Sequence, residues 1–342
     1  MPLRVNPAAV GVLILTVLAL VGVSCSSKPT DAPPPTIEPA RAAISPAVAE
    51  PPAGTVQPFT GRPTAAVFDA TVDALVVLSP GTDAAAASTL TLIGTGSTPP
   101  RTITVPGPAT ALTTHDGTAY LSGHGGYVRV DLAAGTADRI EVADARDTEF
   151  TAVARRQDGG LALGSADGAV YLLGASNEVE HRVGIFARVD ALTTVGDTTV
   201  VLDRGQTSVT SVDADGRTQQ ALRAGEGATT MVADPAGRVL VADTRGDELL
   251  VFGVDPLIMR QRYPVPAAPY GLTGSPELAW VSQTATNVVV GYDLATGIPV
   301  EKVRYPTVQQ PDILAFDDAT GVLFVVSGTG AGVQMIESAG AP

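Results

Sequence analysis

The chain has 342 residues, of which 35 are Asp or Glu and 21 are Lys or Arg, so its formal net charge is −14. This balance argues against a nucleic-acid partner, because contacts with a phosphate backbone need clustered positive charge. One cysteine and three histidines exclude an internal disulfide framework and leave few ligands for zinc. With 45% hydrophobic residues, 36 Gly and 27 Pro, the chain can bury a core but must turn often.

Residues 1–24 have the pattern of a secretory signal peptide. Arg4 is followed by an apolar run of sixteen residues, from Ala8 to Val23, that is broken only by Thr16. Such a run spans about 24 Å as a helix, which is short of the roughly 30 Å hydrocarbon core of a membrane. A basic start and a short apolar core that ends in small residues are typical of an export signal. We therefore expect the rest of the chain to be extracytoplasmic.

Cys25, the only thiol, follows Val21-Gly22-Val23-Ser24. This segment resembles the lipobox of bacterial lipoproteins, although a branched apolar residue is usual at the place of Gly22. The resemblance implies cleavage after residue 24 and lipidation of Cys25, which would anchor the protein to the cell membrane through two acyl chains. The alternatives are an ordinary cleaved signal and an uncleaved anchor.

Residues 25–54 have the composition of a linker. They are rich in Pro, Ala, Ser and Thr and include Pro33-Pro34-Pro35 and Pro51-Pro52. Because such a segment buries little apolar surface and samples extended conformations, we expect a disordered tether. Thirty residues at about 3.1 Å each would reach about 90 Å.

Residues 55–342 contain an internal repeat of roughly forty residues. One recurring feature is a small residue that opens an apolar strand, at Ala66, Ala111, Ala152, Ala191, Thr230, Gly271 and, more weakly, Ile313. A second is a short apolar strand that ends in Ser or Asp, at Leu75–Ser79, Ala119–Ser122, Leu161–Ser165, Thr199–Asp203, Val239–Asp243, Leu278–Ser282 and Val322–Ser327. Because both features keep one period, the sequence predicts seven repeats.

Each repeat has room for about four short strands and shows no convincing amphipathic helix. In the sixth repeat the third and fourth strands are expected at Asn287–Asp293 and Pro299–Tyr305. This pattern predicts an all-β fold, a seven-bladed β-propeller of four-stranded antiparallel blades. The last repeat has no fourth strand after Gly332–Glu337, so we expect Thr55–Thr60 to complete that blade and close the ring.

Two repeats resemble known propeller classes. The sixth, from Pro269-Tyr270-Gly271-Leu272 to Ala295-Thr296-Gly297, resembles the YVTN class. The fifth, with Asp234-Pro235-Ala236-Gly237, is similar to both YVTN and NHL repeats. Together with its N-terminal pattern, the chain resembles the propeller-bearing surface lipoproteins of actinobacteria of the mycobacterial type. The resemblance implies a fold and a location, but no reaction, because propellers range from enzymes to adaptors.

The sequence lacks the usual catalytic motifs, since it has no Gly-x-Ser-x-Gly, His-Glu-x-x-His or Cys-x-x-Cys-His. Asp213-Ala214-Asp215-Gly216 hints at a calcium loop, but Ala224 stands where the closing Glu is required, so we interpret it as a turn. Gly328–Gly332 is expected to be a hairpin, and Trp280 a core residue. We predict no catalytic residue, no metal site and no cofactor.

By analogy with propellers that bind ligands at the mouth of the central channel, we expect polar loop residues on one rim to form a recognition surface. The candidates are Arg62, His124, Glu149, Arg188, Arg204, Glu226, Arg245, Asp247 and Gln310. The sequence thus favours a membrane-anchored, non-catalytic binding or scaffold module of the cell envelope, with a protein, glycan or lipid partner.

The alternative is a calcium-assisted, lactonase-like or other propeller hydrolase. Related propellers hold a channel calcium with Glu, Asp and Asn. Asn177 and Asn287 are the only asparagines in the expected propeller, and neither has an obvious channel position.

Overall fold

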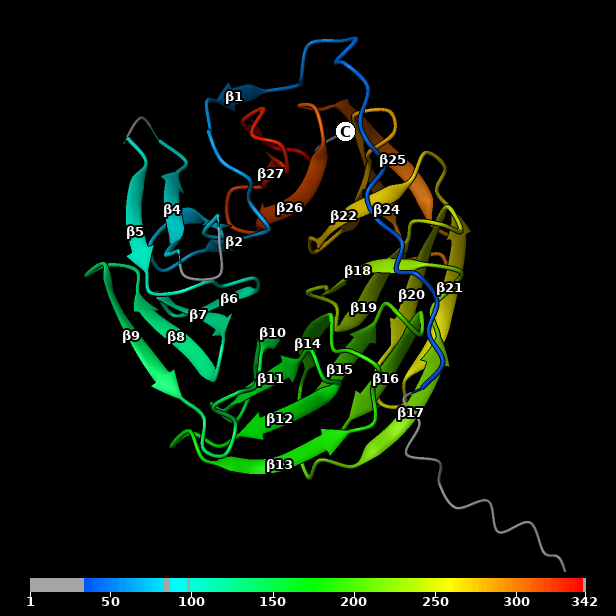
Figure 1. The fold of residues 1–342 in the computed structure, drawn as a ribbon. Helices are drawn as coiled ribbons and strands as arrows, with labels where there is room; N and C mark the ends of the chain where they lie inside the picture. Colours follow the sequence, from blue (N-terminus) through cyan, green and yellow to red (C-terminus); the bar gives the residue numbers. More distant parts are fainter. Residues whose placement is uncertain (1–33, 83–85, 97–98, 341–342) are drawn as a thin grey trace, which may run out of the picture. The chain divides into compact units, whose positions relative to one another are not determined.

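The computed structural model describes residues 34–82, 86–96 and 99–340, and these form the ring of sheets in Figure 1. The residues from Pro35 onward make one compact unit. Every regular element in the described ranges is a β-strand, and the strands form seven four-stranded antiparallel sheets. The predicted seven-bladed propeller is therefore confirmed. Cys25 and the signal pattern of residues 1–24 lie outside the described residues.

Blades 1 to 6 each use four strands in chain order, with the first strand of the blade nearest the channel (Figure 1). Blade 1 contains β2 (Ala65–Asp69), β3 (Ala74–Ser79), β4 (Ser88–Gly94) and β5 (Arg101–Val105). Blade 2 contains β6 (Leu112–His115), β7 (Thr118–Gly123), β8 (Gly126–Asp131) and β9 (Thr136–Glu141). Blade 3 contains β10 (Phe150–Arg155), β11 (Leu161–Ser165), β12 (Ala169–Leu173) and β13 (Val179–Gly184).

The second half of the ring repeats this order. Blade 4 contains β14 (Ala191–Val195), β15 (Thr198–Asp203), β16 (Ser208–Val212) and β17 (Thr218–Arg223). Blade 5 contains β18 (Ala228–Ala233), β19 (Arg238–Asp243), β20 (Glu248–Gly253) and β21 (Ile258–Pro264). Blade 6 contains β22 (Pro269–Gly274), β23 (Leu278–Gln283), β24 (Val288–Asp293) and β25 (Val300–Pro306).

Blade 7 joins the two ends of the propeller sequence. It contains β26 (Pro311–Asp317), β27 (Val322–Ser327), β28 (Val333–Ile336) and, as its outer strand, β1 (Thr55–Gln57). β1 pairs antiparallel with β28, with Val56 opposite Gln334. The predicted closure is confirmed, although the closing strand is shorter than the expected Thr55–Thr60.

The core lies between neighbouring blades, and the second strand of each blade shows why. In β3, Val76 and Leu78 pack toward Leu121 of blade 2, whereas Leu75 and Val77 pack toward blade 7. Because successive side chains of a strand point to opposite faces, a strand covered on both faces has an uninterrupted apolar sequence. This accounts for the apolar runs that mark the repeats.

Trp280 occupies the interface between blades 6 and 7, as predicted for a core residue. Its side chain is fully buried and stacks on Tyr305 and Phe316, with ring centroids 6.3 and 6.1 Å away. The indole Nε1 donates a hydrogen bond to Ser275 Oγ at 3.3 Å, so burial leaves its polar group satisfied.

The face of the ring that carries the loops between the second and third strands of each blade is called the top face below. The connections from one blade to the next lie on the same face, because the first and third strands begin there. The opposite face is the bottom face. This choice follows from the antiparallel order of each sheet.

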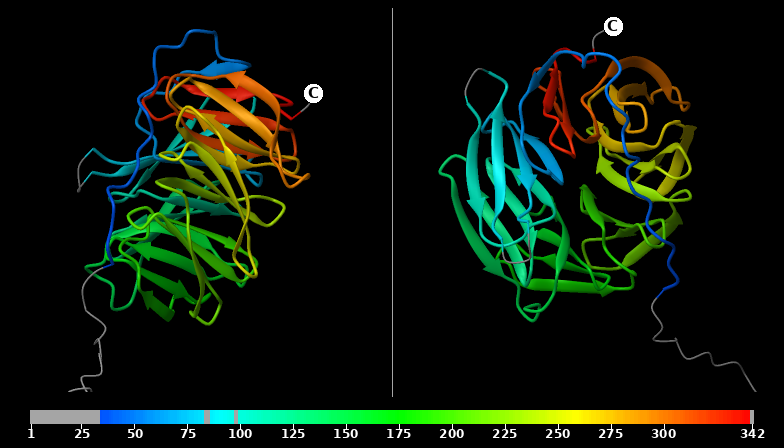
Figure 2. Two further views of the ribbon diagram at one scale, coloured as in Figure 1. Left: turned by 90° about the vertical axis from the view of Figure 1, so that its right-hand side faces the viewer. Right: turned by 45° about the horizontal axis from the view of Figure 1, so that its top comes forward.

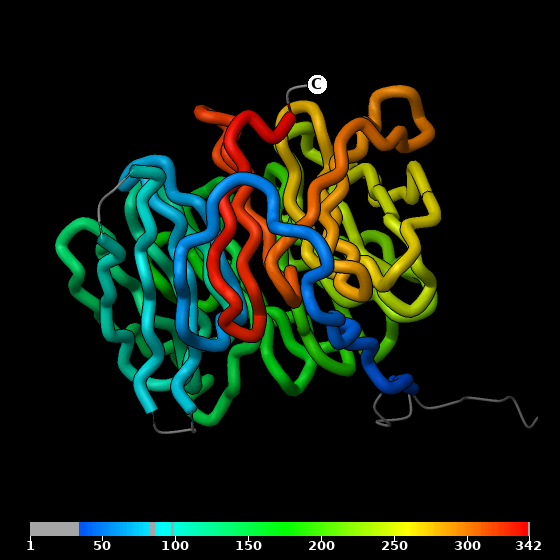
Figure 3. Tube along the Cα trace, turned by 90° about the horizontal axis from the view of Figure 1, so that it is seen from above, coloured from blue at the N-terminus to red at the C-terminus, as the bar shows by residue number. Residues whose placement is uncertain are grey.

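Residues 35–54 lie along the top face as an extended segment, called the strap below (blue in Figures 2 and 3). Ile37 N donates to Gly205 O at 2.8 Å, and Ala53 N donates to Pro306 O at 3.0 Å. For these residues the structure differs from the expected free spacer. Composition correctly indicated an extended chain, but the propeller loops supply its hydrogen-bond partners. Prolines also reduce the conformational entropy that such a segment loses on docking.

Candidate functional site

The central channel widens into a cavity at each end. The top cavity, of about 450 Å³, is lined by the beginnings of the inner strands, and the bottom cavity, of about 760 Å³, by their ends. Among the described residues, the ionisable side chains that line the top cavity are Asp190, Tyr270 and Asp312. Those that line the bottom cavity are His115, Arg155 and Arg156. The two ends of the channel therefore differ in charge.

The repeat itself creates the polar lining of the top cavity. In six blades, the residue just before the small residue that opens the inner strand carries a hydroxyl or a carboxyl group. These residues are Thr110, Thr151, Asp190, Thr229, Tyr270 and Asp312, and all of them line the top cavity. Equivalent positions of the repeats lie at the same level along the channel axis. These six side chains therefore form a polar ring around the top cavity, which we call the polar collar.

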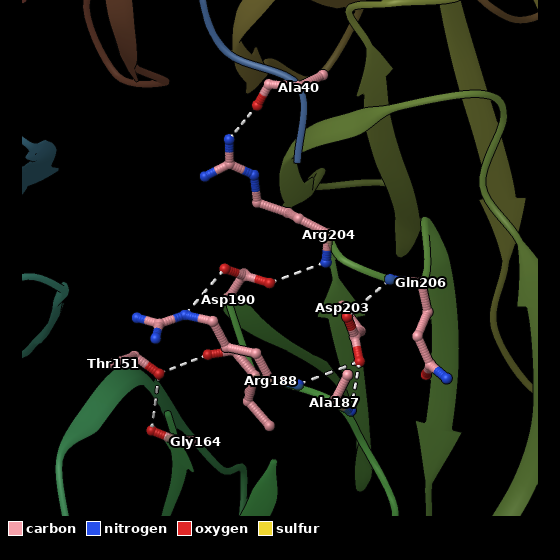
Figure 4. A network of polar contacts seen from close by, with 10 residues as sticks. Ala40, Thr151, Gly164, Ala187, Arg188, Asp190, Asp203, Arg204 and Gln206 are labelled. Atoms are coloured by element: carbon pink, nitrogen blue, oxygen red, sulfur yellow. Dashed lines mark hydrogen bonds and ion pairs between the residues drawn. The ribbon is translucent and has the colours of Figure 1, made fainter. Parts of the chain in front are cut away.

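Asp190 is held by two arginines of blade 4 (Figure 4). Arg204 N donates to Asp190 Oδ2 at 2.8 Å, and Arg188 Nε lies 3.3 Å from Asp190 Oδ1. Burial raises the pKa of Asp190, while the hydrogen bond from Arg204 and the charges of both arginines oppose that rise. The guanidinium of Arg204 also donates to Ala40 O, which connects the cavity to the strap.

Asp203 fixes the loop that carries Arg188. The Asp203 carboxylate is fully buried and accepts hydrogen bonds from Ala187 N at 2.8 Å, Arg188 N at 3.3 Å and Gln206 N at 2.9 Å. Asp243 does the same in blade 5, where it accepts from Glu226 N and Gly227 N at 2.7 Å. In blades 4 and 5, the Asp that ends the second strand thus ties down the top loops next to it.

Asp312 is the least compensated charge in the top cavity. Gln310 Nε2 donates to its Oδ1 at 2.8 Å, and no ion pair involves Asp312 within the described part of the chain. Burial raises the pKa of Asp312 to about 6, although the hydrogen bond from Gln310 opposes the rise. The absence of a side chain at Gly271 lets blade 6 pack closely against blade 7, because a Cβ at this position would lie only 3.0 Å from Asp312 O.

We expect Asp312→Asn to stabilise the protein near neutral pH. The folded-state pKa of about 6 lies above the ordinary value of 3.8, so ionised Asp312 lowers stability above pH 6, and this cost disappears as the pH falls toward 4. The gain should be about 1 kcal/mol after allowance for solvent screening. Denaturant unfolding at several pH values measures it. A gain that is equally large at pH 4 and pH 8 would contradict the burial argument.

Side chains of blades 5 to 7 bind the main chain of the strap. Arg245 Nη2 donates to Glu38 O at 2.7 Å. Gln310 accepts from Ser45 N at 3.0 Å and donates to Ala43 O at 2.8 Å. Ser45 Oγ in turn donates to Thr284 O at 2.6 Å. Apart from the hydroxyl of Ser45, these contacts engage peptide groups of the strap, so this part of the top face holds an extended segment of the same chain.

Gln310→Ala should loosen the middle of the strap. It removes the acceptor of Ser45 N and the donor to Ala43 O, each worth about 1 kcal/mol. We expect amide hydrogen exchange to accelerate about tenfold at Ser45, with no change at Val56 in the closing strand. Equal protection of Ser45 in both proteins would show that Gln310 does not hold the strap.

The nine predicted rim residues fall into separate groups. Arg204, Arg245 and Gln310 contact the strap, and Arg188 and Arg204 contact Asp190. The remaining five residues have only local surroundings. His124 and Glu149 form an isolated bridge between blades 2 and 3, Asp247 accepts from Ala268 N, and Glu226 O accepts from Arg245. Arg62 is exposed just before β2.

The three ionisable residues that line the top cavity were not among the candidates predicted from the sequence. Asp190, Tyr270 and Asp312 each precede a recognised repeat residue, so their shared position was the available signal. The strap was missed as a binding partner for a different reason, because its contacts pair residues far apart in the chain. Gln310 and Ser45, for example, are separated by 265 positions.

The secondary motifs behave as interpreted. Asp213 Oδ1 accepts from Arg217 N at 2.8 Å in a turn between β16 and β17, and Gly330 N donates to Ser327 O in the hairpin after β27. Within residues 34–82, 86–96 and 99–340, no group of three His, Cys, Asp or Glu side chains is arranged to hold a metal ion. In the same ranges no helix is long and apolar enough to cross a membrane.

No protein-family model and no curated protein matches the chain. Solved structures with a similar fold include a streptogramin B lyase, with a TM-score of 0.67 and 11% identity over 83% of this chain and 96% of that one. U3-55K matches with a TM-score of 0.69 and 11% identity, over 84% of this chain and 100% of that one. A chain of the mitotic checkpoint complex matches with a TM-score of 0.67 and 11% identity, over 91% and 98%. At such low identity the likeness concerns the fold alone: the chain has the β-propeller architecture that both enzymes and scaffolds use.

Proposed function

We propose that this protein is a membrane-anchored, non-catalytic binding module of the cell envelope, whose top face engages its partner. The observation that carries the proposal is the strap. Arg204, Arg245 and Gln310, three side chains expected on a recognition surface, bind main-chain groups of an extended peptide. Main-chain recognition of this kind suits a polypeptide partner that docks in an extended conformation.

Among the residues that the structure describes, the part of the top face that the strap does not contact lies over blades 1 to 3. The strap contacts loops of blades 4 to 7 and lines neither cavity of the channel. His124, Glu149 and Arg62 belong to the uncovered arc, with the mouth of the top cavity beside it. A partner that binds to this arc would also contact the mouth of the top cavity.

The lipid anchor belongs to the proposal and rests on the lipobox resemblance around Cys25. If Cys25 is lipidated, only the ten residue steps from Cys25 to Pro35 separate the anchor from the docked strap. At about 3.3 Å per residue this chain spans at most about 33 Å, in place of the 90 Å of a free tether. The propeller would then work close to the membrane surface.

The test has two independent parts. Mass spectrometry of the mature N-terminus should find a diacylated Cys25, and an unmodified thiol would end the anchor proposal. Chemical crosslinking on intact membranes, followed by purification, should return one partner in stoichiometric amount. Replacing His124 and Glu149 together should reduce its recovery, whereas replacing Asp131, an exposed turn residue of blade 2, should not. Failure to recover any such partner would contradict the binding role.

Catalysis is the second candidate, because the structural neighbours include lyases. One of them is described as a catalytically inactive His-to-Ala variant of virginiamycin B lyase from Staphylococcus aureus with quinupristin, at 11% identity and a TM-score of 0.65, over 83% of this chain and 97% of that one. In the described part of the present chain, no histidine lines the top cavity; His115 lines the bottom one. Calcium titration by calorimetry should give no heat, and saturable heat at millimolar calcium would favour an enzyme.

A further inference from the structure

We propose that the top cavity binds a small organic ligand that presents an ammonium group to Asp312 together with hydroxyl groups to the polar collar. The inference deepens the proposed binding role of the top face, on which it rests, and does not depend on the lipid anchor. It starts from the unequal charge of the two cavities.

The lining of the top cavity favours a cation. Its carboxylates are Asp190 and Asp312, and among the described residues no Arg, Lys or His lines it. Asp190 is already compensated by Arg188 and by Arg204 N. Asp312 has only the neutral amide of Gln310. A ligand cation would therefore gain most at Asp312, where a half-buried carboxylate lacks a partner charge.

The remaining polar groups favour ligand hydroxyls. Thr151 Oγ1 donates to Val189 O at 2.5 Å, with Gly164 O at 3.3 Å as a second acceptor. Thr229 Oγ1 lies 3.3 Å from Ala242 O and 2.6 Å from Thr244 Oγ1, with which it forms a hydrogen bond. With their protons engaged, these hydroxyl oxygens still offer lone pairs, so the collar consists mainly of acceptors. A ligand rich in O–H and N–H donors complements it, and about 450 Å³ is enough for a molecule of sugar size.

Of the other titratable groups that line the top cavity, Tyr270 interacts with Asp312, whereas Asp190 is distant. Tyr270 of β22 has a raised pKa, mainly because of burial, and Asp312 adds to that rise while Arg204 opposes it. Asp190 lies in blade 4, three blades away around the ring, so one metal ion cannot use both carboxylates as a close pair. This separation favours a single ammonium at Asp312 over a chelated metal.

Two side chains connect the site to the strap. Gln310 contacts Asp312 Oδ1 and also Ser45 N, and Arg204 contacts Asp190 and also Ala40 O. A ligand that draws Asp312 toward itself competes with Gln310 for the same carboxylate. Occupancy of the cavity should therefore alter protection of the strap near Ser45.

The test compares two probes that differ in one group, glucamine (1-amino-1-deoxysorbitol) and sorbitol, by calorimetry on the full chain near neutral pH. Glucamine should bind about tenfold more tightly than sorbitol, the usual gain from a hydrogen bond to a charged group. Asp312→Asn should abolish this preference. Asp116→Asn, a matched change in an exposed turn at the bottom face, should preserve it. Equal affinity for both probes, or binding of neither, would overturn the proposal.

Two further measurements keep the result interpretable if Asp312→Asn perturbs folding. In the unaltered protein, the preference for glucamine should shrink as Asp312 becomes protonated below its pKa of about 6. A preference that is unchanged at pH 4.5 would exclude Asp312 as the anchor. If calcium displaced glucamine from the same site, the site would be a metal site and the proposal of an organic ligand would be wrong. If the ligand assignment fails while crosslinking still returns a partner, the binding role itself stands.

Discussion

Removing residues 1–60 should lower the melting temperature by more than about 10 °C. The deletion takes away β1, which pairs with β28 at three positions, and Phe59, which packs with Leu75 and Phe324 between blades 1 and 7. Loss of a buried Phe side chain alone costs about 3–5 kcal/mol. The deletion also exposes the hydrogen-bonding edge of β28. Without β1, the N-terminal and C-terminal parts of the propeller are no longer joined by strand pairing within blade 7.

A chain that starts at residue 48 provides the matched comparison. It lacks the strap contacts of Glu38, Ala43 and Ser45 but keeps β1, Phe59 and the hydrogen bond from Gln334 Nε2 to Ala53 O at 2.8 Å. We expect its melting temperature to fall by only a few degrees. Differential scanning calorimetry separates the two effects. Similar transitions for the two deletions would mean that β1 does not close the ring.

Asp203→Ala should destabilise the protein by about 3 kcal/mol. Asp203 is fully buried and accepts three backbone N–H groups, so its loss leaves three donors without a partner. The same change should free Arg188 and so weaken its contact with Asp190. Denaturant unfolding followed by the single Trp280, which reports on blades 6 and 7, measures the loss for the whole ring.

Asp131→Ala is the control for that experiment. Asp131 also accepts two backbone N–H groups, from Ala133 at 2.9 Å and Ala134 at 2.8 Å, but in an exposed turn where water replaces the lost acceptor. We expect a loss below about 1 kcal/mol. If both variants lost the same stability, burial of the second-strand carboxylate would not be what holds the top loops.

The strand pattern could be predicted from the sequence because it depends on local alternation and on repetition. The predicted third and fourth strands of blade 6, Asn287–Asp293 and Pro299–Tyr305, agree with β24 and β25 to within one residue at each end. The site was harder to predict. Arg245 and Gln310 were selected as residues that face an external ligand, yet both bind the strap of the same chain.

By itself the sequence determined the number of blades, the position of their strands and the pairing of the two ends. These features follow from a repeat of about forty residues and from apolar residues on both faces of each second strand. Each repeat of the propeller shows this pattern within its own sequence. Only the tertiary structure decided where the Pro-rich segment lies and which polar residues meet at the channel. Arg204 and Ala40, 164 positions apart, become neighbours only when the ring closes. The same closure gathers the residue before each inner strand into one collar, and burial there gives Asp312 its raised pKa.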